Sequence, residues 1–204
     1  MSRPPELQAF LDTAMPVMQA RASDPRSPAS LERIIEAMTV EAERGASPAE
    51  LPVCDWLKTA LDPDPETPDI AAVFAAFRKL APHLRWRTRS GAPTASEGFA
   101  ESHANAMLLG PGGIEDRHDL WLGVSLLAPG TRYPDHQHLP EETYLVLSPG
   151  EFRKEGGDWF RPGVGGSFFV PPNSVHAMRA EPDAPLFALW ALRPERGEKS
   201  VPDA

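Results

Sequence analysis

The sequence predicts a mainly β protein, an antiparallel sandwich or barrel preceded by a helical region. Two observations support this fold class. From about residue 84 onward, short apolar or alternating runs are separated by Gly, Pro, Asn and Asp residues, as in antiparallel sandwiches and barrels. Before residue 82, apolar residues recur instead at intervals of three and four, which is the period of amphipathic helices.

The composition of the chain is that of a folded protein and narrows its partners. Of the 204 residues, 41% are apolar and 24% are charged, which is typical of globular domains. The net charge is −9 without a run of Lys or Arg, which argues against nucleic acid or an anionic membrane surface as partner. The single cysteine, Cys54, excludes an intramolecular disulfide and a cysteine-rich zinc site. Neither a signal-peptide core nor a run of 18 apolar residues is present, so we expect a cytoplasmic protein.

Three helices are expected in the first part of the chain. The apolar face of the first consists of Leu7, Phe10, Leu11 and Met18. The second has Ser27 as its N-cap, Pro28 at its first helical position and Gly45 after its last turn, following the usual start and stop signals. The apolar face of the third consists of Ile70, Val73, Phe74, Phe77 and Leu80.

The organisation of the chain changes near Pro82. The connector DPDPETPD, residues 62–69, precedes the third helix, and its prolines forbid a continuous helix. We therefore divide the chain into a helical region, residues 1–82, and a β-barrel region, residues 83–204. Amphipathic helices of this size bury their apolar faces most readily against a neighbouring layer, so we expect the two regions to form one integrated structural unit.

Nine segments after residue 83 are expected to contain strands, because they are short, apolar or alternating, and bounded by turn residues. In chain order they are LRWRT, NAMLLG, LWLGVSLLA, TYLVLS, EFRK, DWFRPG, GSFFVPP, VHAMRA and LFALWALR.

A cluster of potential metal ligands lies in the segment YPDHQHLPEETY, residues 133–144. His136 and His138 are two positions apart, so in a strand they share a face, about 6 to 7 Å apart. Glu142 and Tyr144 share a face beyond a short turn, and His176 follows a Pro-Pro-Asn turn downstream. Two histidines and a carboxylate on one wall are a usual ligand set for a divalent first-row metal. The remaining histidines, His83, His103 and His118, are expected in polar surroundings without such a role.

These residues resemble the two motifs of the cupin superfamily. Gly130, His136, His138 and Glu142 match the first motif, whose closing glycine falls one residue late, at Gly150. Gly165, Pro171 and His176 match the second motif, in which Asn173 replaces a glycine and Ala180 an asparagine. Asn tolerates left-handed turn angles, so the exchange at Asn173 is mild. The resemblance implies a cupin jelly-roll barrel, also called a double-stranded β-helix, with one bound metal.

A narrower resemblance covers most of the chain. The segments LAPGTRYPDHQHLPEETYLVLSPGEFR, FVPPNSVHAMRA and LFALWALR look like the Q-type cupin lyases that cleave dimethylsulfoniopropionate (DMSP). In that family the metal is held by the residues matching His138, Glu142, Tyr144 and His176. The residue matching His136 lines the site, and the one matching Tyr133 is a favoured catalytic base, with Tyr144 as the alternative. The resemblance implies one divalent transition metal, with Zn, Fe, Mn and Ni all acceptable.

The implied reaction is a β-elimination that yields acrylate and dimethyl sulfide from a small zwitterionic substrate. A base must remove a proton next to a carboxylate, and a metal stabilises the charge that develops. The sulfonium group of DMSP cannot accept hydrogen bonds and suits aromatic faces. Trp121, Phe168, Phe187 and Trp190 lie in expected strands and are candidates for contacting it. Lys and Arg residues of the barrel region, such as Arg179, are expected at the surface rather than as carboxylate anchors.

Two other functions remain open from the sequence. A cupin oxygenase would use the same histidines and carboxylate on Fe(II), with open coordination positions for O₂. Tyr144 argues against it, because a phenol ligand would fill a position that O₂ needs. A non-catalytic ligand-binding cupin is the third alternative. The resemblance also leaves a homodimer open, since cupins often pair through strand edges.

Overall fold

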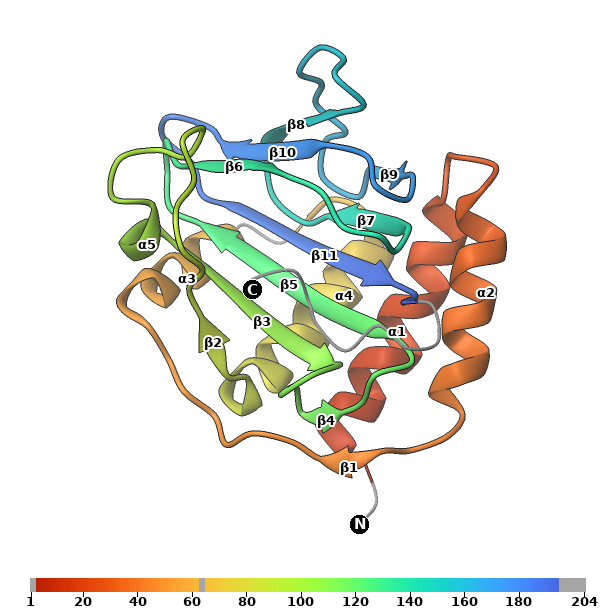
Figure 1. The fold of residues 1–204 in the computed structure, drawn as a ribbon. Coiled ribbons are helices and arrows are strands. Elements are labelled where there is room, and N and C mark those ends of the chain that lie inside the picture. Colours follow the sequence, from red (N-terminus) through yellow and green to blue (C-terminus); the bar gives the residue numbers. More distant parts are fainter. Residues whose placement is uncertain (1–2, 63–64, 195–204) are drawn as a thin grey trace.

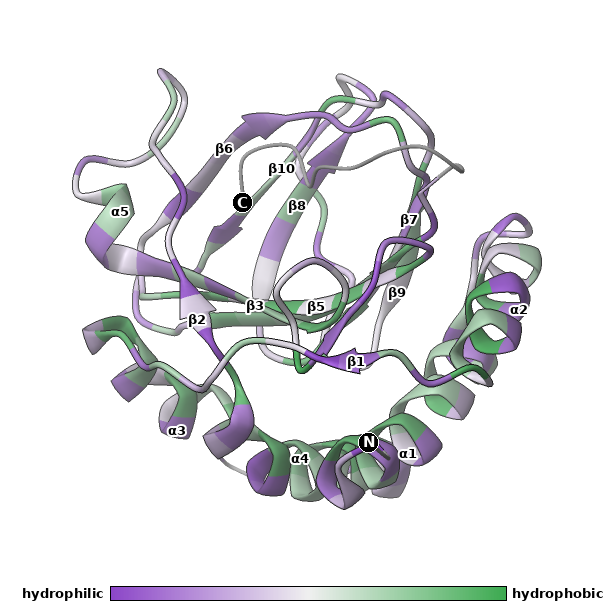
Figure 2. Cartoon of the chain, turned by 60° about the horizontal axis from the view of Figure 1, so that its bottom comes forward, coloured by the Kyte–Doolittle hydropathy of each residue, from purple (hydrophilic) through white to green (hydrophobic). Residues whose placement is uncertain are grey.

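The computed structural model describes residues 3–62 and 65–194, and it arranges them in three layers (Figures 1 and 2). The large sheet has the strand order β1-β4-β3-β5-β11-β7-β9, with β2 also paired to β3. The small sheet has the order β6-β10-β8 and faces one side of the large sheet, while the helices cover the other side. The expected mainly β jelly-roll with helices packed on it is therefore confirmed.

The helices begin close to where proline and the apolar period place them. They are α1 (Pro5–Arg21), α2 (Ser27–Met38), η1 (Pro52–Asp55), α3 (Trp56–Ala60), α4 (Pro68–Leu80), η2 (Ala81–His83) and α5 (Phe99–Ser102). The three expected helices correspond to α1, α2 and α4, whereas the short α3 and α5 were not predicted. Pro63 and Asp64 of the expected connector lie outside the described residues. Among the helices that the structure describes, none is long and apolar enough to cross a membrane.

The end of α2 differs from the sequence prediction. The helix stops at Met38, well before Gly45, and residues 43–44 form the short strand β1 (Glu43–Arg44), which pairs with β4 (Glu115–Asp116). Gly45 is needed for close packing instead of a helix cap, because a Cβ there would lie 1.9 Å from the carbonyl oxygen of Gly113. Ser27, expected as the N-cap, is the first helical residue and is buried.

Eight of the nine expected segments contain a strand, and β1, β4 and β6 lie outside these segments. Besides β1 and β4, the strands are β2 (Trp86–Arg87), β3 (His103–Leu109), β5 (Trp121–Leu127), β6 (Arg132–His136), β7 (Glu142–Val146), β8 (Gly150–Lys154), β9 (Ser167–Val170), β10 (His176–Ala180) and β11 (Leu186–Leu192). The segment DWFRPG forms only an isolated bridge, between Phe160 and Phe152. Its Arg-Pro-Gly sequence explains the difference, because proline has no backbone N–H for a sheet ladder.

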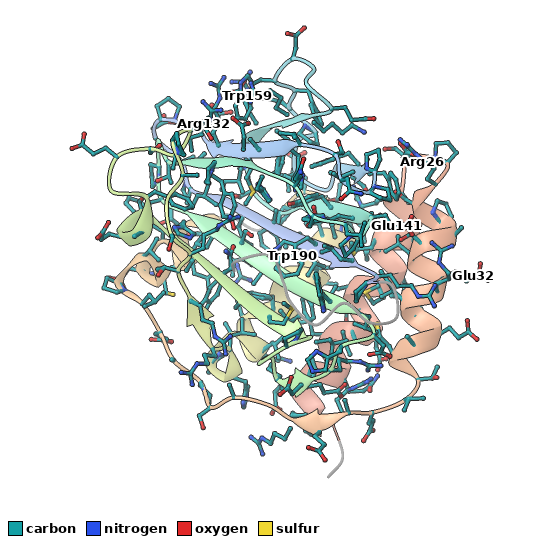
Figure 3. All side chains as sticks on the ribbon, in the orientation of Figure 1. Arg26, Glu32, Arg132, Glu141, Trp159 and Trp190 are labelled. Atoms are coloured by element: carbon teal, nitrogen blue, oxygen red, sulfur yellow. The ribbon has the colours of Figure 1, made fainter. Side chains whose placement is uncertain are left out.

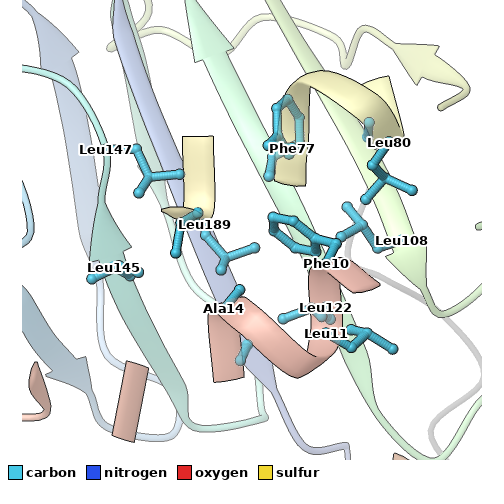
Figure 4. Packing of buried hydrophobic residues seen from close by; sticks show 14 of the residues in the cluster. Phe10, Leu11, Ala14, Phe77, Leu80, Leu108, Leu122, Leu145, Leu147 and Leu189 are labelled. Carbon is cyan, nitrogen blue, oxygen red and sulfur yellow. The ribbon is translucent and has the colours of Figure 1, made fainter. Parts of the chain in front are cut away.

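The outer face of the large sheet packs against the helices. Phe10 and Phe77 project from α1 and α4 toward Leu108, Leu122 and Leu189 of the strands (Figure 4). All five side chains are fully buried, and burying a side chain of this size contributes about 1.5–3 kcal/mol. One continuous apolar cluster thus contains side chains from both regions of the chain.

The inner face of the large sheet has a different character. Along β5, Leu122, Val124 and Leu126 join the helix cluster, whereas Trp121 and Leu127 join a second cluster between the two sheets. Successive side chains of a strand point to opposite faces, which produces this division. The second cluster also contains the two tyrosines of the chain, Tyr133 and Tyr144, and the candidate functional site is built around it.

Candidate metal and substrate site

Three histidines meet at one end of the space between the sheets. His136 ends β6 and lies directly opposite His176 of β10 in the sheet register, and their rings are 4.0 Å apart. His138 lies two residues beyond β6, so the expectation that both histidines of the pair lie on a strand is wrong. Its carbonyl instead accepts the backbone N–H of Asn173 at 2.8 Å. Asn173 has the left-handed φ of 57° that its place in the motif required.

The backbone fixes the orientation of all three imidazoles. Nδ1 of His136 and of His176 lies 2.9 Å from the carbonyl oxygen two residues earlier in the chain. Nδ1 of His138 lies 2.8 Å from the carbonyl oxygen of Pro140. A carbonyl only accepts hydrogen bonds, so each Nδ1 carries the proton and each Nε2 keeps its lone pair. One ligand atom from each of the three rings lies within 4.8 Å of the others, as in a metal-binding group.

Glu142 completes the cluster from β7. Its Oε2 lies 3.3 Å from Nε2 of His138 and 3.2 Å from Nε2 of His176. The carboxylate and both rings are buried, yet Nε2 of His176 forms no hydrogen bond with any residue that the structure describes. Buried imidazole nitrogens that converge on a carboxylate, one of them without a hydrogen-bond partner among the described residues, fit a divalent first-row metal held by imidazole and carboxylate. The residues present therefore fit a metal ion, without selecting which one.

The protonation states of Glu142 and His136 are consistent with metal binding. Burial acts to raise the pKa of the Glu142 carboxyl, but the two neighbouring histidines outweigh burial and hold that pKa well below its ordinary value. Burial and the nearby His176 lower the pKa of His136 well below its usual range. For His138 burial acts to lower the pKa, while Glu142 raises it above its ordinary value. The carboxylate is thus ionised and His136 is neutral, as metal coordination requires.

Tyr144 lies beside the cluster among aromatic rings. It follows Glu142 by two positions on the same face of β7, and its ring stacks on Phe168 at 4.8 Å. Burial raises the pKa of its phenol well above the ordinary value, and the Glu142 carboxylate raises it further. Phe152 and Phe160 pack around Phe168 at 4.9 and 5.2 Å. The sequence analysis did not single out these two phenylalanines.

Tyr133 is connected to the large sheet by a chain of hydrogen bonds. Nε1 of Trp190 donates to Oγ of Ser125 at 3.0 Å, and that hydroxyl donates to Oδ1 of Asn105 at 2.7 Å. Nδ2 of Asn105 in turn donates to Oη of Tyr133 at 3.1 Å. The indole N–H can only donate, and the later bonds of the chain run in the same direction, from Ser125 to Asn105 and from Asn105 to Tyr133. The Tyr133 oxygen is consequently an acceptor, and Nη1 of Arg89 approaches it as a second donor at 3.5 Å.

Burial and the neighbouring hydrogen-bond donors act in opposite directions on the pKa of the Tyr133 phenol. Burial raises its pKa above the ordinary value, whereas the Arg89 guanidinium and the hydrogen bond from Asn105 act to lower it. The ring of Tyr133 lies 4.9 Å from that of His136. A titratable oxygen with two donors therefore lies next to the metal-binding group.

The four candidate aromatic residues do not all reach this site. Trp121, Phe168 and Trp190 belong to the cluster between the sheets, and Trp190 lies near the middle of the molecule (Figure 3). Gly123 leaves room for it, because a Cβ there would lie 2.3 Å from the indole. Phe187 lies on the opposite face, fully buried with its ring 4.9 Å from Phe77. Its assignment as a substrate contact is therefore wrong.

The sequence analysis also missed His103 and Arg89. His103 is fully buried instead of lying in polar surroundings, and it stacks on Phe99 with the ring centroids 3.7 Å apart. Its Nε2 accepts the backbone N–H of Arg89 at 3.0 Å, while its Nδ1 bonds to the carbonyl of Phe99. Burial lowers the pKa of this imidazole, so it is a neutral ring that fastens the Arg89 backbone beside Tyr133.

Comparisons with known proteins agree with this arrangement. The family model of the dimethylsulfoniopropionate lyases matches residues 26–188. The chain belongs to this family. It is similar to the dimethylsulfoniopropionate lyase DddQ of Ruegeria pomeroyi, with 32% identity over 148 residues, 72% of each chain. The crystal structure of that DddQ superimposes with a TM-score of 0.73 and 28% identity, covering 97% of this chain and 95% of the other.

Two further relatives extend the similarity. A chain from the crystal structures of the DMSP lyases RdDddP and RnDddQII superimposes with a TM-score of 0.70 and 25% identity, covering 97% of both chains. The putative dimethylsulfoniopropionate lyase DddL of Cereibacter sphaeroides is 33% identical over 120 residues, which are 58% of this chain and 50% of DddL. The similarity to the solved structures thus includes the helical region as well as the sheets.

Proposed function

We propose that this protein is a metal-dependent lyase that cleaves DMSP into acrylate and dimethyl sulfide. The observation that carries the proposal is the Tyr133 oxygen, which accepts two hydrogen bonds beside a group of three histidines and a glutamate. This arrangement offers a base and a cation site side by side, in a chain that belongs to the DMSP lyase family. Removal of a proton next to a carboxylate needs both.

His138, Glu142, Tyr144 and His176 would hold the metal, with His136 within reach of the same centre. When bound, the metal supplies Lewis-acid stabilisation of negative charge on the substrate carboxylate. Glu142 contributes an ionised oxygen, and the imidazoles contribute Nε2 lone pairs that the backbone keeps in position. The family resemblance, not the geometry, carries the assignment of Tyr144 as a ligand.

Tyr133 would act as the base in its phenolate form. Its oxygen takes the proton from the α-carbon, and the electron pair of that C–H bond forms the C=C bond of acrylate. The bond between the β-carbon and sulfur breaks, and its electron pair leaves with sulfur as neutral dimethyl sulfide. The donors Asn105 and Arg89 stabilise the phenolate before the transfer. Tyr144 is the poorer base, because the Glu142 carboxylate opposes a second negative charge next to it.

The aromatic cluster would surround the sulfonium group. Trp121 and Trp190 come from the large sheet, and Phe168 stacks on Tyr144 beside the metal-binding group. Aromatic faces attract a cation that has no hydrogen-bonding capacity. The uncharged dimethyl sulfide lacks this attraction, which favours its release after the C–S bond has broken.

Headspace gas chromatography tests the proposed function. The purified protein, loaded in turn with Zn(II), Fe(II), Mn(II) or Ni(II), is given DMSP under strictly anaerobic conditions. We expect dimethyl sulfide with at least one metal and an equal amount of acrylate, and neither product after chelation. Anaerobic turnover also separates a lyase from an Fe(II) oxygenase, which needs O₂. Absence of dimethyl sulfide with all four metals would refute the proposed substrate.

A further inference from the structure

The segment that connects β2 to α5, residues 88–98, holds Arg89 in a defined place. At one end, His103 accepts the backbone N–H of Arg89. Farther along, Oγ1 of Thr94 accepts the N–H of Asp135 at 2.8 Å, and Oγ of Ser96 accepts the N–H of Arg132 at 2.7 Å. The segment is thereby tied to β6, the strand that carries Tyr133.

The guanidinium of Arg89 faces the candidate site. Its central carbon lies 5.4 Å from the ring centroid of Tyr133, and Nη1 lies 3.5 Å from the phenol oxygen. Nε is buried and has no hydrogen-bond partner within residues 3–62 and 65–194. A buried N–H that has lost water without gaining an acceptor is unfavourable, and native proteins rarely retain one without a reason.

Three partly or fully buried arginines near the two sheets are neutralised by acidic side chains, whereas Arg89 is not. Arg117 pairs with Glu115 and Asp119, Arg132 pairs with Asp135, and Arg179 pairs with Glu151. In the part of the chain that the structure describes, no acidic side chain pairs with Arg89. Arginine stays protonated in proteins, so a permanent positive charge without a counter-ion lies beside the proposed base.

We propose that Arg89 binds the carboxylate of the substrate through Nε and the amino group next to it. This inference rests on the proposed function. Adjacent guanidinium N–H groups form a fork that matches the two oxygens of a carboxylate. DMSP has one anionic group, and the carbon that loses the proton is bonded directly to it. A carboxylate held at Arg89 therefore brings that carbon next to the Tyr133 oxygen.

The same contact selects the substrate and sets its direction. With the carboxylate at Arg89, the other end of the molecule extends away from β6 toward the aromatic side chains of the large sheet and β9. Molecules without a carboxylate lack the contact, and molecules with an amide in its place lose the charge. Arg89 is thus a specificity-determining residue for short carboxylates, and the sequence analysis expected no arginine in this role.

The test compares Arg89→Met and Arg89→Lys with Arg85→Met, a matched control at an exposed arginine four residues earlier, just before β2. Isothermal titration of the metal-loaded proteins with acrylate and with the neutral acrylamide measures binding, and initial rates with DMSP give KM and kcat. Metal content is measured for each variant. We expect Arg89→Met to weaken acrylate binding and to raise KM about 10- to 100-fold. Acrylamide binding and metal content should stay within twofold of the wild type.

Two further readouts separate a binding role from a structural one. Arg89→Lys should fall between the wild type and Arg89→Met, because it keeps the charge and loses the fork. Methylguanidinium added to Arg89→Met should restore part of the acrylate affinity, while Arg85→Met should match the wild type throughout.

Acrylate affinity within twofold of the wild type in Arg89→Met would overturn the proposal. So would equal losses for acrylate and acrylamide, loss of the metal, or a wild-type protein that binds no acrylate. If Arg89→Met does not fold, the decision falls to Arg89→Lys, in which unchanged acrylate binding counts against the proposal. A wild type that releases no dimethyl sulfide but binds acrylate through Arg89 would refute the proposed function and leave this inference standing.

Discussion

The two faces of the large sheet differ in what their side chains contact: one face packs against the helices, and the other lines the candidate site. On β11, Phe187 and Leu189 join the helices in an apolar cluster, while Trp190, between Leu189 and Ala191, faces the candidate site. On β3, Ala104 lies in the helix cluster, whereas its neighbours His103 and Asn105 make the hydrogen bonds that surround Tyr133 and Arg89. The same strands therefore contribute side chains to both faces, with helices as neighbours on one face and the candidate site on the other.

This difference shows how one sheet can serve stability and chemistry separately. Alternation along a strand places successive residues in two environments, so a substitution on one face leaves the other face largely intact. Substitutions on the helix side should change the free energy of unfolding. Substitutions on the inner side should change metal binding, substrate binding or turnover.

The largest effect is expected on the inner face, at Tyr133. Loss of a general base typically costs 10²–10⁴ in rate, so Tyr133→Phe should lower kcat by about that factor and keep its metal, since only the hydroxyl is removed. Tyr144→Phe should disturb the metal content as well as the rate. Steady-state kinetics and metal analysis check both variants. Near wild-type turnover in Tyr133→Phe, with an inactive but metal-loaded Tyr144→Phe, would transfer the role of base to Tyr144.

The next effect is expected on the helix face. Phe187→Ala removes a ring from a fully buried position against Phe77 and should lower the free energy of unfolding by about 3–5 kcal/mol. The kcat of the molecules that remain folded should stay within twofold. Urea unfolding measures the first quantity and initial rates under native conditions measure the second. Trp190→Phe is the matched variant on the other face. It removes the first hydrogen bond of the series that ends at Tyr133. We expect it to lower kcat and to change the free energy of unfolding less than Phe187→Ala does.

The Phe187 experiment also sharpens the domain organisation. We propose that residues 1–82 and 83–204 fold as one unit, because both supply side chains to one apolar cluster. Phe187→Ala should then unfold in a single transition when followed by fluorescence and by circular dichroism. Two separate transitions, with the sheets surviving the loss of the helices, would contradict this proposal.

The smallest effect is expected at the surface of the helical layer. Arg21 of α1 and Asp69 of α4 form an ion pair with an Nε to Oδ2 distance of 2.7 Å, and their side chains remain 25% and 41% exposed. Such pairs contribute less than about 1 kcal/mol. The Arg21 guanidinium lowers the pKa of Asp69 to about 2, so the contribution is present above the ordinary pKa near 4 and is lost as the pH falls toward 2.

Asp69→Asn should therefore lower the free energy of unfolding slightly at pH 7 and by less at pH 3. Urea unfolding of the variant and the wild type at both pH values measures this difference. A loss that is larger at pH 3 than at pH 7 would show that the ion pair is not its source.

Much of the fold follows from local patterns in the sequence, while part of the site does not. The apolar periods located α2 and α4, and the spacing of His136, His138, Glu142 and His176 predicted a cluster that the structure does bring together. The joint assignment of Phe187 and Trp190 to the site could have been excluded, because they lie three positions apart and a strand alternates with period two. The sequence did not indicate which of these two residues faces inward.

The contacts of Tyr133 could not be read from the sequence. Asn105 is 28 residues away from Tyr133, Ser125 is 65 residues away from Trp190, and Arg89 is 44 residues away from Tyr133. They meet only because β3, β5 and β11 are neighbours in one sheet and β6 belongs to the sheet opposite. Gly45 illustrates the same limit, since its close approach to Gly113 has no local signature and resembled a helix stop.

The most direct test of the central claim is to locate the metal by anomalous diffraction from crystals of the metal-loaded protein. The central claim is that the reaction takes place at the inner face of the large sheet. It requires the metal to lie between Nε2 of His138, Nε2 of His176 and the carboxylate of Glu142, close to Tyr133. We predict one strong anomalous peak at that place, and its loss in His176→Ala. A peak elsewhere in the molecule, or full metal occupancy in His176→Ala, would contradict the account.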